Sequence, residues 1–507
     1  MKKYLLILLI VGKDFICISQ IPTQQEYKEL ASLFAIDVQL MGNIKDYNPV
    51  LNQPFSYSTV LELEGGRTAV FNRKILIIVN SSIYDQLQWK INRYAFDINY
   101  MYGYKIVMIK VSGASHQQIK SIILSESTNL DGVVLIGDLP AAWYEVENDF
   151  EGYAPEPNYQ GYGYANWPCD LYYMDIDGVW NDTDGNGIYD SHTGNVHPEF
   201  FLGRISTSHM GTLLTEKIGL EQYLDKDHRF YLGHYPVNKQ YGLAYTDSSW
   251  VNSSQFQSIK YLYGNNNYDR IDFGNPFFGK TDYLSRLSNN RYEFIQVACH
   301  SDYHYHILST DVVLASDIFN NGTKAIGYNL YSCCACRWTS IKPTSQSCFL
   351  AGAYIYNSTN SGLVAVGSTK SGSMLNFSGF YTPLGNGKSM GDSFFTWWKA
   401  TCSSTYSNYN VYWYYGMTII GDPMVNFYHC MNNFCVNQIT LNSFDISNTV
   451  SHRYIISKNS ITANNYVIPT GKSIIFNASE VSLNAGFECP VGSTFEISNE
   501  GCMSNCQ

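Results

Sequence analysis

Two apolar segments of the sequence each end at a side chain suited to nucleophilic chemistry. The segment 294–298 is followed closely by His300, and the segment 325–331 is followed by Cys333. A cysteine thiolate attacks a carbonyl carbon when a nearby imidazole takes up its proton, and backbone N–H groups can stabilise the oxyanion. If both segments are strands of one sheet, Cys333 and His300 can form such a pair. Each also has a plainer interpretation, as a buried structural cysteine and a hydrogen-bonded core histidine.

Three cysteines crowd the end of the second apolar segment, at positions 333, 334 and 336. Cysteines this close in sequence rarely pair with one another, so the cluster indicates catalysis, metal binding or burial. Zinc is an alternative ligand because thiolates and imidazoles bind it, although the spacing fits no common zinc motif. The side chains that would supply such a site are His300, His304, His306, Cys333, Cys334 and Cys336.

A second motif places oxygen ligands at the spacing of a calcium-binding loop. With Asp182 as the first position, Asp184, Asn186 and Asp190 are the third, fifth and ninth, and the carbonyl of Ile188 is the seventh. A glycine stands at the sixth position, where the loop must turn, but the glutamate of an EF-hand is absent from the twelfth. We predict an isolated structural Ca²⁺ loop, with an Asx-rich turn as the alternative. The acidic residues that could add ligands are Asp175 and Asp177.

An alternation of apolar strands and helical segments can position these residues. The expected strands are 74–79, 105–111, 132–137, 200–205, 242–246, 294–298, 325–331 and 362–366, and the expected helices are 83–102, 116–125, 212–225 and 347–356. This order implies parallel βαβ units with right-handed crossovers. We therefore predict an α/β fold with doubly wound, mainly parallel sheets, helices on both faces, and a site at the carboxyl ends of the strands.

The composition restricts the class of protein. The chain has 507 residues, 45% of them hydrophobic and 15% charged, which excludes a mainly disordered protein. The net charge of −11 argues against nucleic acid as the main partner, because phosphate contacts need clustered Lys and Arg.

The N-terminus has the layout of a secretory signal peptide. A basic start at residues 1–3 precedes an apolar run over 4–12, which is too short to span a bilayer. We predict a signal peptide over residues 1–20, no transmembrane segment, and a secreted or cell-surface location of the bacterial type. A buried N-terminal strand is the alternative.

Six short motifs, in order, resemble the gingipain-type cysteine peptidases. The first half of that family has a strand ending in Gly-Asp, an Asp-x-x-Tyr segment and a strand ending in Gly-Arg. The second half has a histidine strand, a cysteine strand and a Gly-Asp-Pro ending. The matching segments are GVVLIGD (132–138), CDLY (169–172), PEFFLGR (198–204), VACH (297–300), NLYSC (329–333) and GMTIIGDP (416–423). The resemblance covers roughly residues 74–428.

The resemblance implies a caspase-like fold and an endopeptidase that cleaves protein or peptide substrates through a Cys–His dyad. By position, Cys333 would be the nucleophile and His300 the dyad histidine. The oxyanion would lie at the backbone N–H groups of Cys333 and Ser301. The resemblance implies no organic cofactor.

Two departures from the family pattern leave alternatives open. The family histidine lies between glycines, whereas His300 lies between Cys299 and Ser301. The loop after the nucleophile also lacks the family glycine, so Cys334 and Cys336 are alternative nucleophiles. The rival functions are a catalytically degenerate secreted or surface binding protein that keeps the fold, and a zinc-dependent hydrolase that uses the His/Cys cluster.

We predict five regions along the chain. They are the signal peptide 1–20, an N-terminal segment 21–70 that could be a prosegment, a first α/β subdomain 71–235 with the calcium loop, a catalytic caspase-like subdomain 236–430, and a C-terminal β module 431–507. The short alternating segments of the last region resemble β-stack modules of secreted bacterial proteins, which implies association with a cell surface. Disulfides are expected among Cys430, Cys435, Cys489, Cys502 and Cys506.

Overall fold

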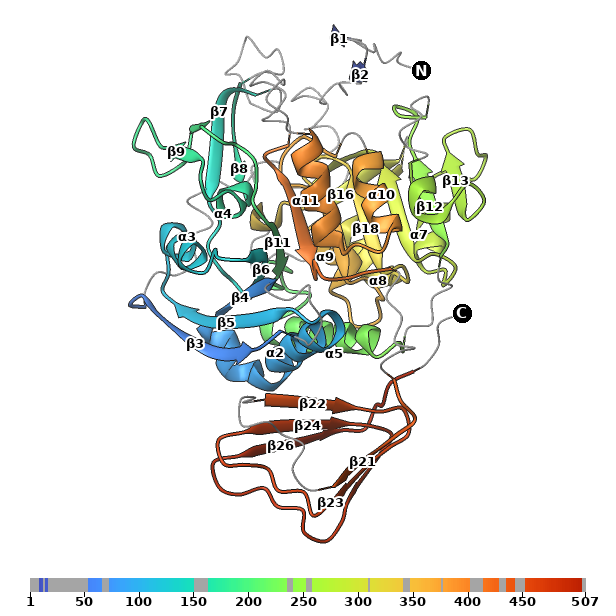
Figure 1. The fold of residues 1–507 in the computed structure, drawn as a ribbon. Coiled ribbons are helices and arrows are strands. Elements are labelled where there is room, and N and C mark those ends of the chain that lie inside the picture. Colours follow the sequence, from blue (N-terminus) through green and yellow to red (C-terminus); the bar gives the residue numbers. More distant parts are fainter. Residues whose placement is uncertain are drawn as a thin grey trace.

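Figure 1 shows a computed structural model of the protein. It describes residues 9–11, 14–16, 53–65, 73–149, 163–234, 240–251, 258–308, 311–340, 347–374, 377–401, 414–427, 435–442 and 452–503. The predicted signal peptide and N-terminal segment lie largely outside these residues. Within residues 1–20, strand β1 (Leu9–Val11) pairs antiparallel with β2 (Asp14–Ile16).

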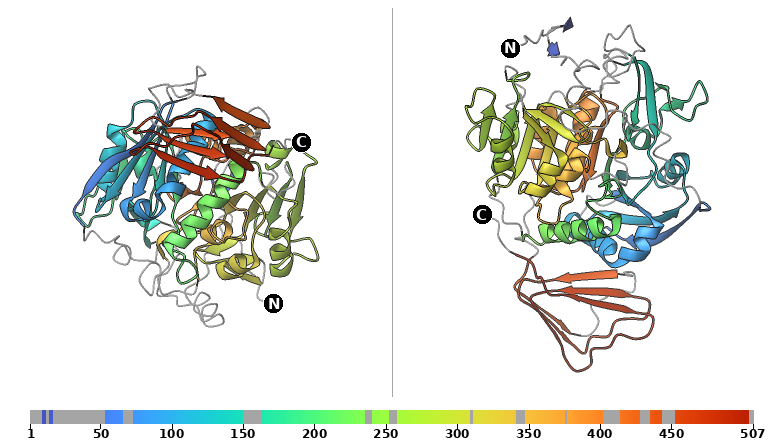
Figure 2. Two further views of the ribbon diagram at one scale, coloured as in Figure 1. Left: turned by 90° about the horizontal axis from the view of Figure 1, so that it is seen from below. Right: turned by 180° about the vertical axis from the view of Figure 1, so that it is seen from behind.

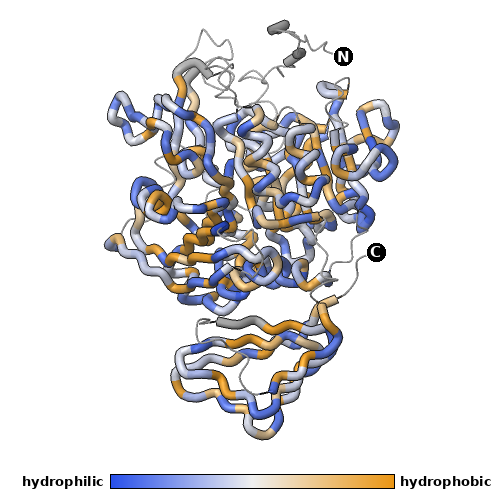
Figure 3. Tube along the Cα trace, in the orientation of Figure 1, coloured by the Kyte–Doolittle hydropathy of each residue, from blue (hydrophilic) through white to orange (hydrophobic). Residues whose placement is uncertain are grey.

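One continuous sheet of eleven strands forms the body of the described protein. Its order across the sheet is β13 (Tyr268–Asp272), β12 (Gly242–Thr246), β14 (Phe294–Ala298), β18 (Gly327–Tyr331), β19 (Val364–Ser368), β20 (Met417–Gly421), β11 (Phe201–Ile205), β6 (Leu130–Ile136), β4 (Lys74–Asn80), β5 (Lys105–Ser112) and β3 (Ser56–Leu63). The strands between the edge strands β13 and β3 are largely buried because helices cover both faces, and Figure 3 shows the first-half strands as hydrophobic segments. The predicted α/β class, with a mainly parallel sheet and helices on both faces, is confirmed.

The two halves of the sheet run in opposite directions. Strands β12, β14, β18 and β19 are parallel to one another, whereas β20 is antiparallel to β19 and parallel to β11. Strand β20 thus joins the predicted regions 71–235 and 236–430 within one sheet. The carboxyl ends of β12, β14, β18 and β19 all lie at one edge, which is where the sequence predicts a site.

Helices fill the crossovers between the strands. They are α2 (Ser81–Tyr102), α3 (His116–Ser125), α4 (Leu171–Met174), α5 (Glu216–Tyr231), α6 (Lys260–Tyr263), α7 (Lys280–Leu287), α8 (Ala315–Asn321), the 3₁₀ turn η3 (Trp338–Ser340), α9 (Leu350–Ile355), α10 (Ser378–Gly385) and α11 (Met390–Thr401). Besides the β1–β2 pair, three small antiparallel sheets are formed by described segments outside the large sheet. They are β7 (Trp143–Asp149) with β8 (Gly163–Pro168), β9 (Val179–Asn181) with β10 (Ser191–Thr193), and β15 (His300–Asp302) with β16 (Tyr305–Leu308) and β17 (Asp311–Leu314).

The C-terminal β module is a stack of parallel rungs below α2 and α5, as Figure 1 and the right view of Figure 2 show. One sheet contains β21 (Gln438–Asn442), β23 (Ser460–Asn464) and β25 (Glu480–Leu483), and the other contains β22 (His452–Ile456), β24 (Ser473–Asn477) and β26 (Thr494–Ser498). Side-chain amides of Asn442, Asn464 and Asn484 form a ladder across successive rungs, with N···O distances of 3.0 and 2.7 Å. This ladder satisfies polar groups at the corner where the chain leaves one sheet.

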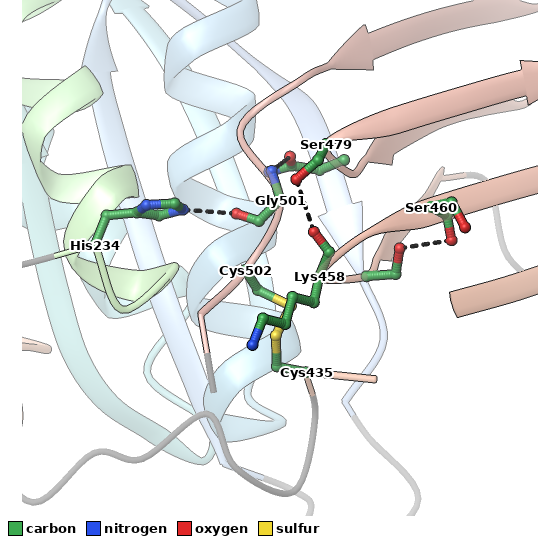
Figure 4. The surroundings of a disulfide bond; sticks show 9 residues. His234, Cys435, Lys458, Ser460, Ser479, Gly501 and Cys502 are labelled. Atoms are coloured by element: carbon green, nitrogen blue, oxygen red, sulfur yellow. Dashed lines mark hydrogen bonds between the residues drawn. A yellow bond between two sulfur atoms is a disulfide. The ribbon is translucent and has the colours of Figure 1, made fainter. Parts of the chain in front are cut away.

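A disulfide joins the two ends of the C-terminal module, next to hydrogen bonds that connect the module to the body. Cys435, before the first rung, is bonded to Cys502, after the last one (Figure 4). Beside this bond, Nε2 of His234 lies 2.8 Å from the carbonyl oxygen of Gly501, and the N–H of Met503 donates to the carbonyl of Leu232. Cys489 is free and exposed, while Cys430 and Cys506 lie outside the described residues.

In the described part of the chain, no helix has the length and apolarity that a bilayer crossing requires.

Candidate active site

Strands β14 and β18 bring His300 and Cys333 to the same place at the edge of the sheet. The two strands are adjacent and parallel, with Ala298 opposite Tyr331. His300 and Cys333 each follow this pair by two positions. The hydroxyl of Ser301 donates a hydrogen bond to the carbonyl oxygen of Cys333, so the two loops are joined directly. Ser301, which stands where the family has glycine, therefore links the loop of the histidine to that of the cysteine.

Exposure distinguishes the three clustered cysteines. Cys333 is half-buried, whereas Cys334 and Cys336 are 3% and 0% exposed. Burial raises the pKa of the Cys336 thiol, whose sulfur lies against Gly367 of β19. A nucleophile must be accessible and form a thiolate, so Cys333 satisfies the requirement best among the three.

His300 lies in a pocket formed by the loop that follows β12. Its Nε2 is 3.1 Å from the hydroxyl oxygen of Ser249, and its ring lies 4.6 Å from that of Trp250, measured between ring centroids. Burial lowers the pKa of His300 below its usual value near 6.5, and the charge of Asp247 partly opposes this shift. At neutral pH the imidazole is therefore neutral and can accept a proton.

Asp247 is a site residue that the sequence analysis does not identify. It follows β12 directly, is 3% exposed, and its N–H donates to the carbonyl of Ala298 at 2.8 Å. Its carboxylate accepts hydrogen bonds from Ser248 and from the N–H of Ser249. Asp247, His300 and Cys333 thus follow three neighbouring strands, in the order β12, β14, β18. The available signal is an acidic residue immediately after a predicted strand.

A second thiol–imidazole pair lies deeper in the same region and has a different character. The sulfur of Cys299 is 3.2 Å from Nδ1 of His306, whose Nε2 is 2.9 Å from the hydroxyl of Tyr354. Burial raises the pKa of Cys299 and lowers that of His306 to about 3, so both groups are neutral. This pair holds the β15–β16 hairpin that carries His300.

The histidines and cysteines of the zinc alternative are not brought together as a set of ligands. His306 contacts Cys299, and His304 is buried in the turn between β15 and β16. Among the described residues, groups of three or more potential ligands within 4.8 Å contain only carboxylates. The structure therefore gives no support to a zinc site at this cluster in the described part of the chain.

The first half of the sheet anchors the loop that follows Cys333. Arg204 of β11 donates two hydrogen bonds of 2.7 and 2.9 Å to Asp170, and its guanidinium lies 4.6 Å from the ring centroid of Trp338. Arg337 donates to the carbonyl of Asn166 in β8 at 2.9 Å. The Asp-x-x-Tyr and Gly-Arg motifs thus supply a buried ion pair that contacts the loop after Cys333. Such an ion pair has little conformational freedom, so it holds this loop in place.

The predicted calcium loop folds as a compact turn between β9 and β10. Asp182 accepts hydrogen bonds from the N–H groups of residues 185, 186 and 187, and Asp190 accepts one from the N–H of Thr183. Gly187 has a φ of 93°, a conformation that favours glycine. The loop therefore already has the reversal that the sequence spacing implies.

Glu145 of β7 enters this loop from a distant part of the sequence. It is 6% exposed, and it accepts a hydrogen bond of 2.8 Å from the side-chain amide of Asn186. Carboxylate oxygens of Glu145, Asp184 and Asp190 lie within 4.8 Å of one another. Asp175 and Asp177 lie in a separate carboxylate group with Glu199. Glu145 thus brings a buried acidic side chain to a loop that has threonine at its twelfth position.

The Gly-Asp-Pro motif is a packing element at the far end of β20. The buried carboxylate of Asp422 accepts hydrogen bonds from the hydroxyls of Tyr94 and Tyr231, at 2.6 and 2.5 Å. These tyrosines belong to α2 and α5, so the motif joins two helices to the sheet.

Two solved structures are similar to this chain over about 70% of its length. No family model and no curated protein matches the chain. The crystal structure of the Arg-specific cysteine proteinase gingipain R is similar over 70% of this chain and 78% of its own, with a TM-score of 0.48 and 15% identity. The complex of the pro- and mature domains of RgpB from Porphyromonas gingivalis is similar over 69% of this chain and 79% of its own, with a TM-score of 0.47 and 14% identity.

These similarities have TM-scores below 0.5 and identities of 14% and 15%. At 15% identity they assign no substrate and no activity to this chain. The chain has an α/β architecture, and the proposal of what it does rests on its own site.

Proposed function

We propose that the protein is a cysteine-type endopeptidase in which Cys333 is the nucleophile and His300 the proton shuttle. One observation carries the proposal: the half-buried Cys333 and the neutral His300 stand at equivalent positions beyond two paired strands, with Asp247 beyond the third. An accessible thiol, an imidazole and a carboxylate in this order are the groups that acyl transfer needs.

The proposed reaction uses these groups in two stages. His300 takes the proton of the Cys333 thiol, and the sulfur attacks the carbonyl carbon of a peptide bond. Backbone N–H groups of Cys333 and Ser301 would bind the oxyanion. His300 then gives its proton to the leaving amine, so the C–N bond breaks and an acyl-enzyme remains. Water, deprotonated by His300, hydrolyses the thioester and restores the thiol.

The proposal is tested by hydrolysis of a mixed library of internally quenched peptides by reduced, full-length protein. We expect hydrolysis that is lost after alkylation with iodoacetamide and unaffected by a zinc chelator. If no peptide is hydrolysed and a thiol-directed peptide probe does not label the protein, the results would instead support a catalytically degenerate binding protein.

Removal of the Asp247 charge should change the pH dependence of the reaction. In Asp247→Asn we expect kcat/KM to fall about 10- to 100-fold, because the charge of the carboxylate stabilises protonated His300 and its hydrogen bond holds Ser249, which contacts the imidazole. Since Asp247 raises the pKa of His300, the acidic limb of the kcat/KM profile should move to lower pH. The measurement is the full pH profile with one peptide.

Asp302→Asn is the matched control for this variant. Asp302 is a buried carboxylate in the same hairpin, but it acts on His304 rather than His300. A profile of Asp247→Asn that superimposes on that of Asp302→Asn and wild type would contradict the role of Asp247.

We also propose export of the protein, with residues 1–20 as signal peptide and the C-terminal module as a means of attachment to a cell surface. The basic start and apolar run support the first part. N-terminal sequencing of secreted protein, together with fractionation of a form truncated before residue 431, tests both parts.

We propose that Ca²⁺ binds the loop 182–190 and stabilises the fold without taking part in the chemistry. The support is the convergence of Asp184, Asp190 and the buried Glu145, with Asp182, Asn186 and the carbonyl of Ile188 at the remaining positions of the spacing. Carboxylates held this close repel one another, and a cation offsets that cost.

Calcium should raise the melting temperature of the wild-type protein. At a hundredfold excess over its Kd, an ion that binds only the folded state adds about 2.7 kcal/mol of stability. In Asp184→Ala and Glu145→Gln we expect a lower melting temperature that no longer responds to calcium or chelator.

Asp85→Asn serves as the control, since Asp85 is an exposed carboxylate on α2, far along the chain from the loop. If the wild type has the same melting temperature in calcium and in chelator, the loop is an Asx-rich turn that does not bind calcium.

A further inference from the structure

The loop that follows β13 exposes two large apolar side chains at the edge of the sheet that carries the candidate site. Phe273 is 52% exposed and Phe277 is 77% exposed. Single exposed apolar residues are common on protein surfaces, but here two large apolar side chains within five residues of one loop are exposed.

The loop 273–279 is held firmly, so this exposure is a property of the folded state. The ring of Phe278 stacks on that of buried Tyr245, with centroids 4.6 Å apart, and the N–H of Gly279 donates to the Tyr245 hydroxyl at 3.0 Å. The N–H of Phe277 donates to the side chain of Asn275 at 2.9 Å. A preorganised apolar surface binds a partner without the cost of ordering the loop.

The loop 273–279 lies at the same edge of the sheet as Asp247, His300 and Cys333. Strand β13 is parallel to β12, which is parallel to β14, so the loops after all three leave the same edge. Strands in a sheet are spaced about 4.8 Å apart, which places β13 about 15 Å from β18. Figure 1 shows β12 and β13 at one end of the sheet and β3 at the other.

The proposed chemistry fixes which part of a substrate extends toward β13. His300 protonates the leaving amine, so the chain that follows the scissile bond passes from Cys333 toward His300. Continuing past β14, that chain reaches the loops after β12 and β13. An extended peptide advances about 3.3 Å per residue, so about 15 Å corresponds to four or five residues.

We propose that Phe273 and Phe277 form a platform that binds a bulky apolar side chain of the substrate, located four or five residues after the scissile bond. This platform rests on the proposed endopeptidase function, and it names part of its substrate class: polypeptides with an apolar residue on the leaving-group side. Charged side chains at the same positions gain nothing from the platform and lose hydration.

Two substrates separate the platform from the reaction. The first is a short peptidyl aminocoumarin, which has no residues after the scissile bond. The second is an internally quenched peptide with the same residues before that bond and a Leu or Phe four residues after it. In the double variant Phe273→Ala/Phe277→Ala, we expect kcat/KM for the long peptide to fall at least fivefold and that for the short substrate to stay unchanged.

The matched control is Tyr57→Ala, which removes an exposed aromatic ring (58% exposed) from β3 at the opposite end of the sheet. It should leave both substrates unaffected. Replacing the apolar residue of the long peptide by Glu should lower wild-type kcat/KM to that of the double variant.

Unchanged hydrolysis of the long peptide by the double variant, or an equal loss with both substrates, would overturn the platform while leaving the endopeptidase intact. Failure of the wild type to cleave either substrate would instead overturn the proposed function itself.

Discussion

Cys333→Ala is expected to abolish peptide hydrolysis while the protein remains folded. Loss of the nucleophile removes the covalent pathway, so kcat/KM should fall by at least about 10⁴. Because Cys333 is half-buried, removal of its sulfur leaves the core intact, and the melting temperature should change by no more than a few degrees. Hydrolysis of a fluorogenic peptide and the thermal unfolding of the same sample measure both effects.

Cys334→Ala is the control for this variant, because it removes the adjacent thiol. Cys334 is 3% exposed, and its N–H donates to the carbonyl of Lys370 at 3.0 Å, so its backbone rather than its sulfur fixes the loop. We expect nearly full activity. Activity that survives in Cys333→Ala but disappears in Cys334→Ala or Cys336→Ala would assign the reaction to another thiol.

His300→Gln should have the next largest effect, a fall in kcat/KM of about 10²–10⁴, since a general base and acid contributes that much. In the wild type, activity requires the neutral imidazole. Burial lowers the pKa of His300, so kcat/KM should rise with pH through a midpoint below 6.5 and be fully developed at neutral pH. The measurement is kcat/KM from pH 4 to 8 for both proteins.

His304→Gln and His306→Gln separate the dyad from the zinc alternative. His306 lies in the buried chain with Cys299 and Tyr354, so its loss should lower the melting temperature more than the chemical rate. His304→Gln should be mild in both respects. Equal, metal-reversible losses at all three histidines would favour zinc.

The sequence predicts the sheet of this protein well because its parallel strands are continuous apolar runs. Strands β4, β5, β6, β12, β14 and β18 lie within or close to their predicted ranges. Helix α5 is displaced: it begins at Glu216 rather than at 212, since Thr215 is extended, and it continues to Tyr231, just before the positive φ of Gly233. Local signals fix where a helix starts and stops only when its caps are recognisable.

The site is predictable in part for the same reason. His300 and Cys333 are visible because each follows an apolar strand, and adjacency of β14 and β18 aligns them. Asp247 and Glu145 are not identified, since their roles depend on contacts between segments far apart in sequence, such as β7 beside the loop between β9 and β10. The parallel pairing of strands in the C-terminal module also depends on contacts between separate segments, so the sequence does not predict it.

The most direct test of the central claim is to identify the residue that a peptidyl acyloxymethyl ketone modifies. Reduced wild-type protein is incubated with a small library of such probes, digested, and mapped by mass spectrometry. We expect one adduct, on the sulfur of Cys333, that forms slowly or not at all in His300→Gln. An adduct on Cys299, Cys334 or Cys336, or hydrolysis of peptides without any cysteine adduct, would contradict it.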